Sequence, residues 1–120
     1  MARILVVDDD DDVRTLLEHI LSAARYEVDA AGTVKAAQAL LELNYYNLLL
    51  ADLMLPDGSG MQIAEDAHRR GTPAIILTAY PHRFRKADLV RFDLILKPVR
   101  PPELLEAVSK VLKPSHSNSE

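Results

Sequence analysis

The sequence predicts an α/β fold in which five parallel strands alternate with five helices, a (βα)5 arrangement. Apolar runs of strand length recur along the chain, and between them apolar residues recur at helical spacing. Four of the runs end directly in polar, reactive residues, and they cover residues 4–9, 48–52, 74–78 and 94–97. Right-handed crossovers place helices on both faces of such a sheet. We therefore expect a doubly wound parallel sheet with the strand order 2-1-3-4-5.

The first half of the chain predicts three strands separated by two helices. We expect these strands at residues 4–7, 27–30 and 47–52. After the first strand, apolar residues from Val13 to Ala24 recur at helical spacing behind a run of acids, which the N-terminus of a helix favours. Gly32 and Thr33 then break the second strand and cap a helix with apolar residues from Val34 to Leu41. The third strand is apolar throughout, which is typical of a central strand buried on both faces.

The second half predicts two more strands and three helices. We expect the strands at residues 74–78 and 93–96. Ser59 follows a turn and is a suitable cap for a helix that ends near Arg70. The stretch from Tyr80 to Arg91 has only a weak helical stripe and many basic residues, with Pro81 as a suitable start. Pro98, Pro101 and Pro102 delay the last helix, which carries Leu104, Val108, Val111 and Leu112.

The length of 120 residues predicts a single domain. The absence of cysteine excludes disulfides and thiol chemistry. The net charge of −4 gives no reason to expect nucleic-acid binding. No apolar run approaches the ~20 residues that span a bilayer, and the N-terminus lacks the pattern of a signal peptide. We therefore expect no membrane insertion and a cytoplasmic location. The domain should cover residues 1–113, followed by a disordered polar tail over residues 114–120.

The polar residues that end the strands predict one shared site. They are Asp8, Asp9, Asp52, Thr78 and Lys97. Because the carboxyl ends of parallel strands meet at one edge of a sheet, these side chains should be neighbours. Three close carboxylates repel one another and raise one another's pKa unless a cation neutralises them. Hard oxygen ligands of this kind favour Mg²⁺.

The same residues suit phosphoryl transfer. Asp52 follows the most apolar strand and is the best-placed nucleophile, so attack on a phosphoryl group would give an aspartyl phosphate. Lys97 would offset the charge of the phosphoryl group, and Thr78 would donate a hydrogen bond to it. Each residue alone has an ordinary explanation, since an acid run is usually solvated or caps a helix and Lys97 could be a surface lysine. Their joint occurrence at successive strand ends favours function.

These motifs closely resemble the receiver domain of two-component response regulators, over residues 3–112. The matching segments are Ile4–Asp10, Asp52–Gly60, Thr78–Ala79 and Lys97–Pro98. The resemblance implies a flavodoxin-like fold, Asp52 as the phospho-acceptor, and a histidine kinase or histidine phosphotransfer protein as donor, with a downstream protein as target. It also implies that Asp8, Asp9, Asp52 and the backbone carbonyl of Met54 bind Mg²⁺, and that Thr78 and Lys97 contact the phosphoryl group. A cis bond between Lys97 and Pro98 is expected on the same basis.

The chain departs from the receiver pattern before and within the last strand. Leu94 stands where receivers usually carry an aromatic residue that rotates inward after phosphorylation. The segment between Thr78 and Lys97 is a few residues short, and in this it resembles a divergent group of single-domain regulators from alphaproteobacteria. We therefore expect switching to rely on Thr78 and on a mobile segment from Ala79 to Arg91.

Two other functions are considered. A phosphatase or dehalogenase-like enzyme could use Asp52 as nucleophile, but such phosphatases generally carry a second aspartate two residues later, where this chain has Met54. A degenerate receiver could act only as an interaction surface, but the full set of acid pair, Asp52, Thr78 and Lys97 argues against it. We expect no turnover beyond the protein's own phosphorylation and dephosphorylation.

Overall fold

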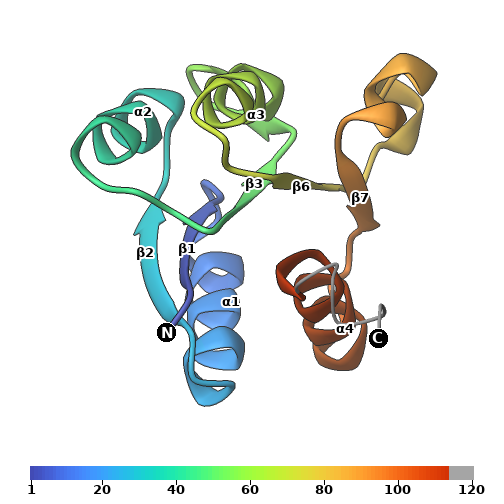
Figure 1. Cartoon of the computed structure of the whole chain (residues 1–120). Helices are drawn as coiled ribbons and strands as arrows, with labels where there is room; N and C mark the ends of the chain where they lie inside the picture. Colours follow the sequence, from blue (N-terminus) through green and yellow to red (C-terminus); the bar gives the residue numbers. More distant parts are fainter. Residues whose placement is uncertain (114–120) are drawn as a thin grey trace, which may run out of the picture.

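Five strands form one parallel sheet in a computed structural model of the chain, which describes residues 1–113 (Figure 1). They are β1 (Arg3–Val7), β2 (Glu27–Ala31), β3 (Leu48–Asp52), β6 (Ala74–Thr78) and β7 (Asp93–Leu96). Their order across the sheet is β2-β1-β3-β6-β7, so the predicted order 2-1-3-4-5 is confirmed. The predicted tail at 114–120 lies outside the described residues.

Four α-helices among the described residues cover the two faces of this sheet. They are α1 (Asp11–Ala23), α2 (Val34–Leu43), α3 (Gly60–Arg69) and α4 (Pro101–Leu112). Figure 1 shows α2 and α3 on one face and α1 and α4 on the other. None of the described helices is long and apolar enough to cross a membrane.

The central strands are buried on both faces, as the sequence predicts. Leu5 and Val7 of β1 belong to the core that packs beneath α2 and α3, whereas Ile4 and Val6 belong to the core beneath α1 and α4. All five residues of β3 are buried. This alternation explains why a continuous apolar run, and not an alternating one, marks these strands.

The fourth crossover differs from the prediction, because it contains no α-helix. It consists of two short 3-10 helices, η1 (Pro81–Arg83) and η2 (Lys86–Val90), with Phe84 in extended conformation between them. Phe84 and Asp88 are its buried side chains. Its residues thus lack the apolar stripe that would hold a full helix against the sheet, and short crossovers commonly use 3-10 turns instead.

Ion pairs hold this crossover in place. The buried carboxylate of Asp88 lies 3.5 Å from Nε of Arg85 and 3.8 Å from a guanidinium nitrogen of Arg91. Arg91 also pairs with Glu65 of α3 at 2.9 Å and stacks on the ring of Phe92. Charged side chains therefore do part of the anchoring that an apolar helix face does in the other crossovers.

A small hairpin follows β3, where the sequence predicts only a turn. Its two strands are β4 (Met54–Leu55) and β5 (Gly58–Ser59). At its tip, the Asp57 carboxylate accepts hydrogen bonds from the backbone N–H groups of Val34 (2.7 Å) and Lys35 (3.0 Å) at the start of α2. These bonds hold the pKa of Asp57 below its ordinary value. The hairpin and α2 are therefore fixed to each other.

Candidate functional site

Asp8, Asp9 and Asp52 meet at the carboxyl end of the sheet, as predicted. Asp8 and Asp9 follow β1, and Asp52 ends the neighbouring strand β3. One carboxylate oxygen from each of the three lies within 4.8 Å of the others. Asp8 is fully buried, Asp52 is almost buried and Asp9 is exposed. The group therefore has a solvent-facing side at Asp9 and a buried side at Asp8.

Lys97 extends from the end of β7 into this group. Its ammonium donates to Oδ2 of Asp8 (2.8 Å) and to Oδ2 of Asp52 (3.1 Å). The backbone N–H of Lys97 donates to the carbonyl of Thr78 (2.9 Å), and the bond between Lys97 and Pro98 is cis, as predicted. The sequence predicts that Lys97 contacts a phosphoryl group, and in the structure its single positive charge offsets part of the negative charge of Asp8 and Asp52.

The site perturbs the pKa of both Asp52 and Lys97. Burial raises the pKa of Asp52, and the negative charge of Asp8 raises it further. The ammonium of Lys97 lowers this pKa but does not cancel the increase, so the pKa of Asp52 is raised. Burial lowers the pKa of Lys97, but the hydrogen bond and charge of Asp8 and the charge of Asp52 outweigh it, so that pKa is also raised. Lys97 therefore stays charged at neutral pH, whereas Asp52 holds a proton more readily than an ordinary aspartate.

Thr78 ends β6, the strand beside β3, and its side chain is buried. Its Oγ1 accepts a hydrogen bond from the backbone N–H of Tyr80 (2.9 Å). A hydroxyl can donate as well as accept, so Thr78 keeps a hydrogen that can be donated to a ligand. The bond to Tyr80 also ties the start of the fourth crossover to this side chain.

Met54 lies next to Asp52 at the start of the hairpin. Its backbone N–H donates to Oδ1 of Asp52 across a long 3.4 Å contact. The role of its carbonyl as a metal ligand stays a prediction.

The acidic residues from Asp8 to Asp12 have two roles, because some belong to the site and others stabilise the start of α1. The second carboxylate oxygen of Asp8 accepts from the backbone N–H of Asp10 (3.0 Å). The side chain of Asp10 caps α1, because it accepts from the N–H groups of Asp12 and Val13. The ordinary explanation of an acid run, helix capping, therefore holds for Asp10 and not for Asp8 or Asp9.

Arg14 and Gly60 support the site but are not among the site residues that the sequence predicts. Arg14 donates to the backbone carbonyl of Asp8 (2.7 Å) and pairs with Asp11. Gly60 begins α3 against β3, where a Cβ atom would lie 2.0 Å from the carbonyl oxygen of Asp52. Only glycine fits so close to another backbone. The sequence signal for Gly60 was its place in the receiver-like segment, but its contact is visible only in the fold.

An apolar hollow of about 340 Å³ adjoins Lys97. Its other lining residues come from α1 and from the ends of β6 and β7, and they are Val13, Leu16, Leu17, Ala79, Pro98 and Val99. Leu16, which lines the hollow, is 46% exposed. The hollow offers an apolar contact surface directly beside the charged site.

Comparison with known proteins matches this architecture. A family model, the response regulator receiver domain, matches residues 4–109. The chain belongs to this family. Among curated proteins, this receiver domain is 35% identical to the response regulator protein PilR of Pseudomonas aeruginosa over 114 residues, which is 91% of the chain and 26% of PilR. It is 33% identical to the transcriptional regulatory protein SrrA of Staphylococcus aureus, over 97% of the chain and 50% of SrrA. The receiver domain thus spans about a quarter to a half of these relatives.

Solved structures show the same fold. The response regulator protein TrrA from Thermotoga maritima, in complex with Mg²⁺ and BeF, is 33% identical with a TM-score of 0.84, over 93% of this chain and 100% of TrrA. TrrA in complex with the histidine kinase ThkA gives a TM-score of 0.83 at 33% identity, over 94% of this chain and 100% of TrrA. A receiver domain from Methanospirillum hungatei is 36% identical, with a TM-score of 0.83 over 93% of this chain and 94% of that one.

Proposed function

We propose that this receiver domain accepts a phosphoryl group on Asp52 and signals through phosphorylation-dependent binding of a partner protein. The observation that carries the proposal is the pairing of Lys97 with both Asp8 and Asp52, at 2.8 and 3.1 Å, beside the exposed Asp9. Asp52 is the reactive group, because its carboxylate is held by Lys97 while its side chain stays 12% exposed, whereas the side chain of Asp8 is 0% exposed.

In the proposed reaction, an Asp52 carboxylate oxygen attacks the phosphorus of a phosphohistidine. The new O–P bond forms as the N–P bond breaks, and the imidazole nitrogen keeps the electron pair of that bond. Lys97 leaves its contact with Asp52 for an oxygen of the phosphoryl group, where its positive charge offsets the transferred negative charge. Thr78 donates its hydroxyl hydrogen to another of these oxygens. Hydrolysis by water reverses the modification, so the protein turns over no substrate other than itself.

The carboxylates fit a divalent cation. The three clustered carboxylates are accompanied by one ammonium, that of Lys97, which pairs with Asp8 and Asp52, so the group keeps about two negative charges. Asp8, Asp9 and Asp52, with the backbone carbonyl of Met54, would hold Mg²⁺, since its preferred ligands are oxygens. When bound, Mg²⁺ neutralises charge on the phosphoryl oxygens and so lowers the barrier to transfer.

The phosphodonor is proposed to be a histidine kinase or a histidine phosphotransfer protein. The complex of the similar protein TrrA with the histidine kinase ThkA supports this class of donor. The apolar hollow with Leu16 at its rim is the proposed docking site, because it adjoins Lys97. The acidic net charge of −4 supports a protein target and no direct binding of nucleic acid by this chain. A cytoplasmic location without membrane insertion is part of the same proposal, as is a domain boundary at residue 113.

The switch is proposed to run through Thr78 and the segment from Ala79 to Arg91. Leu94, which replaces the usual aromatic residue, is partly buried and packs against the core beneath α2 and α3. It has no ring that could move into space left by Thr78. The mobility of the segment in the unphosphorylated state stays a prediction.

Labelling with acetyl phosphate tests the proposal. The wild type should be labelled in the presence of Mg²⁺ and not in the presence of a chelator, and Asp52→Asn should lose the label. Full labelling of Asp52→Asn would contradict the assignment of the nucleophile. Release of phosphate from small phosphoesters without labelling would favour a phosphatase, and partner binding without any labelling would favour a degenerate receiver.

A further inference from the structure

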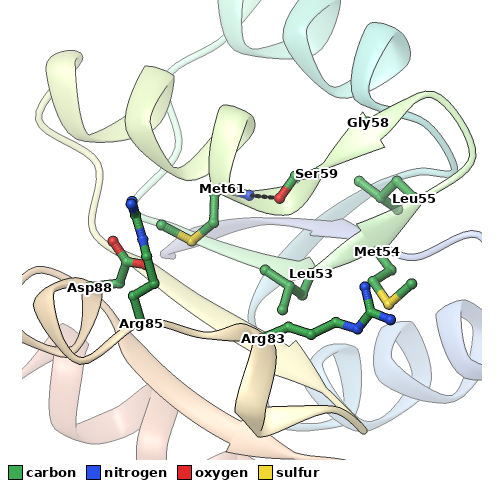
Figure 2. Close-up of a pocket in the computed structure, with 9 residues that line it drawn as sticks. All are labelled: Leu53, Met54, Leu55, Gly58, Ser59, Met61, Arg83, Arg85 and Asp88. Atoms are coloured by element: carbon green, nitrogen blue, oxygen red, sulfur yellow. Dashed lines mark hydrogen bonds and ion pairs between the residues drawn. The ribbon is translucent and has the colours of Figure 1, made fainter.

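A cleft opens beside Asp52, between the hairpin and the 3-10 helices of the fourth crossover (Figure 2). Its volume is about 310 Å³. The residues that define its character are Leu53, Met54, Leu55, Met61, Arg83 and Arg85. In Figure 2 the four apolar side chains come from residues 53–55, where β3 leads into the hairpin, and from the start of α3, and the two arginines extend from the fourth crossover opposite. The cleft therefore has one apolar wall and one wall with two arginines, on which Asp88, paired with Arg85, also lines the cleft.

The guanidinium groups of the two arginines can contact a ligand. Within residues 1–113, Arg83 makes no ion pair, and its guanidinium lies 5.9 Å from the centre of the Tyr80 ring. Arg85 makes a 3.5 Å contact with Asp88, but its side chain is 79% exposed. In a protein with a net charge of −4, this is a local basic surface. Guanidinium groups bind carboxylates through paired hydrogen bonds.

The cleft is open to solvent, since Met54 is 44% exposed at its edge. An enclosed pocket would surround most of a small molecule, whereas an open cleft covers one face of an extended chain. Methionine side chains adapt to different apolar partners because they are unbranched and flexible. We propose that the cleft binds an acidic segment of a partner protein, with a large apolar side chain against Met54 and Met61 and carboxylates on Arg83 and Arg85.

Both walls are hydrogen-bonded to residues of the site. On the hairpin side, the Met54 N–H donates to Oδ1 of Asp52. On the basic side, the Tyr80 N–H donates to Oγ1 of Thr78 (2.9 Å), and the Arg83 N–H donates to the carbonyl of Tyr80 (3.0 Å). A phosphoryl group on Asp52 would change the acceptor of the Met54 N–H, and movement of Thr78 toward that group would shift its hydrogen bond with Tyr80. Partner affinity should therefore depend on phosphorylation, a conclusion that rests on the function proposed above.

The three methionines of the chain make this testable. Met54 and Met61 line the cleft, whereas Met1 is 82% exposed at the N-terminus and serves as an internal control. The full chain, labelled with ¹³C at the methionine methyl groups, would be titrated with a short peptide in which leucine and phenylalanine are flanked by aspartates. The methyl signals of Met54 and Met61 should shift together, and that of Met1 should not. The matched peptide with serines in place of the apolar residues should bind at least tenfold more weakly.

Charge reversal tests the basic wall. Arg83→Glu and Arg85→Glu should each weaken peptide binding about tenfold or more, whereas Arg100→Glu, the same change at an exposed position outside the cleft, should not. Beryllofluoride with Mg²⁺ should change the affinity measured at Met61 by about fivefold or more. Met61 is the better reporter, because beryllofluoride on Asp52 would shift the nearby Met54 directly.

Several outcomes would overturn the inference. The first is that the Met54 and Met61 signals do not shift, or shift through self-association without peptide. The second is that the serine peptide or inorganic phosphate binds as tightly as the apolar acidic peptide. The third is that beryllofluoride leaves the affinity unchanged in a protein that acetyl phosphate labels. Loss of acetyl phosphate labelling at Asp52 in the wild type would instead contradict the proposed function, and the peptide titration of the untreated protein would still be informative.

Discussion

Replacing Lys97 by methionine should destabilise the protein at neutral pH, because it leaves two buried carboxylates without a counter-charge. The Lys97 side chain is 20% exposed, and the side chains of its partners Asp8 and Asp52 are 0% and 12% exposed. Removing one member of a buried ion pair costs about 3–5 kcal/mol. Because solvent reaches Lys97 and Asp52 in part, we take the lower end, about 3 kcal/mol in the free energy of unfolding.

Urea denaturation measures this change. With a slope of about 2 kcal/mol per molar urea, the midpoint of Lys97→Met should fall by about 1.5 M. Lys86→Met, which changes an exposed lysine in η2, is the matched control and should shift the midpoint by less than about 0.3 M.

The pH dependence gives a second test. The pKa of Asp52 is already raised from its ordinary value of 3.8, and loss of the lysine charge raises it further. A raised carboxyl pKa favours the protonated folded state, so its contribution to stability is complete below 3.8 and is lost as pH rises through the folded-state pKa. The deficit of Lys97→Met should therefore shrink on acidification, and Asp52→Asn in the same chain should reduce it at pH 7. The reasoning would be refuted if Lys97→Met lost no more stability than Lys86→Met. It would also be refuted if the loss of stability in Lys97→Met changed neither with pH nor with the added Asp52→Asn substitution.

Three further predictions concern the metal, the donor and the switch. Mg²⁺ at ten times its dissociation constant should stabilise the wild type by about 1.4 kcal/mol in thermal unfolding, and Asp9→Asn should need more Mg²⁺ for the same shift; an equal response in both would count against the site. Leu16→Asp should slow phosphoryl transfer from a histidine kinase at least tenfold with acetyl phosphate labelling unchanged, whereas Leu43→Asp, at another exposed leucine, should affect neither; parallel loss in both assays would contradict donor docking at the hollow. Amide exchange over residues 79–91 should be fast in the free protein and slower with beryllofluoride and Mg²⁺, and protection equal to that of β3 in the free state would contradict the proposed switch.

The sequence predicts the sheet and the meeting of the site residues because both follow from local patterns. Apolar runs place the strands, and the rule that carboxyl ends of parallel strands share an edge brings Asp8, Asp52 and Lys97 together. The pattern does not reveal what each side chain contacts in the absence of ligands. The position of Lys97 between two carboxylates depends on the balance of charge across strands that lie far apart in sequence.

The parts missed by sequence reasoning depend on contacts between distant segments. Gly60 looks like a turn residue, but its role arises from the approach of α3 to the backbone of Asp52. Asp57 looks like a turn residue too, and it caps a helix that begins 23 residues earlier. The fourth crossover has a weak helical stripe, and the structure resolves the ambiguity as 3-10 turns held by Asp88.

The charged anchoring of the fourth crossover makes one part of this protein responsive to ionic strength. A helix packed on a sheet is held by apolar contacts and internal hydrogen bonds, which dissolved ions weaken little. The contact between Arg91 and Glu65, with side chains 39% and 43% exposed, lies within reach of mobile ions, whose screening length is about 8 Å at physiological concentration. The buried Asp88 is shielded from them. Rising salt should therefore loosen the crossover from α3 before it disturbs the turn around Asp88, so the same chain would present a stiffer surface in dilute buffer than in the ionic environment of a cell.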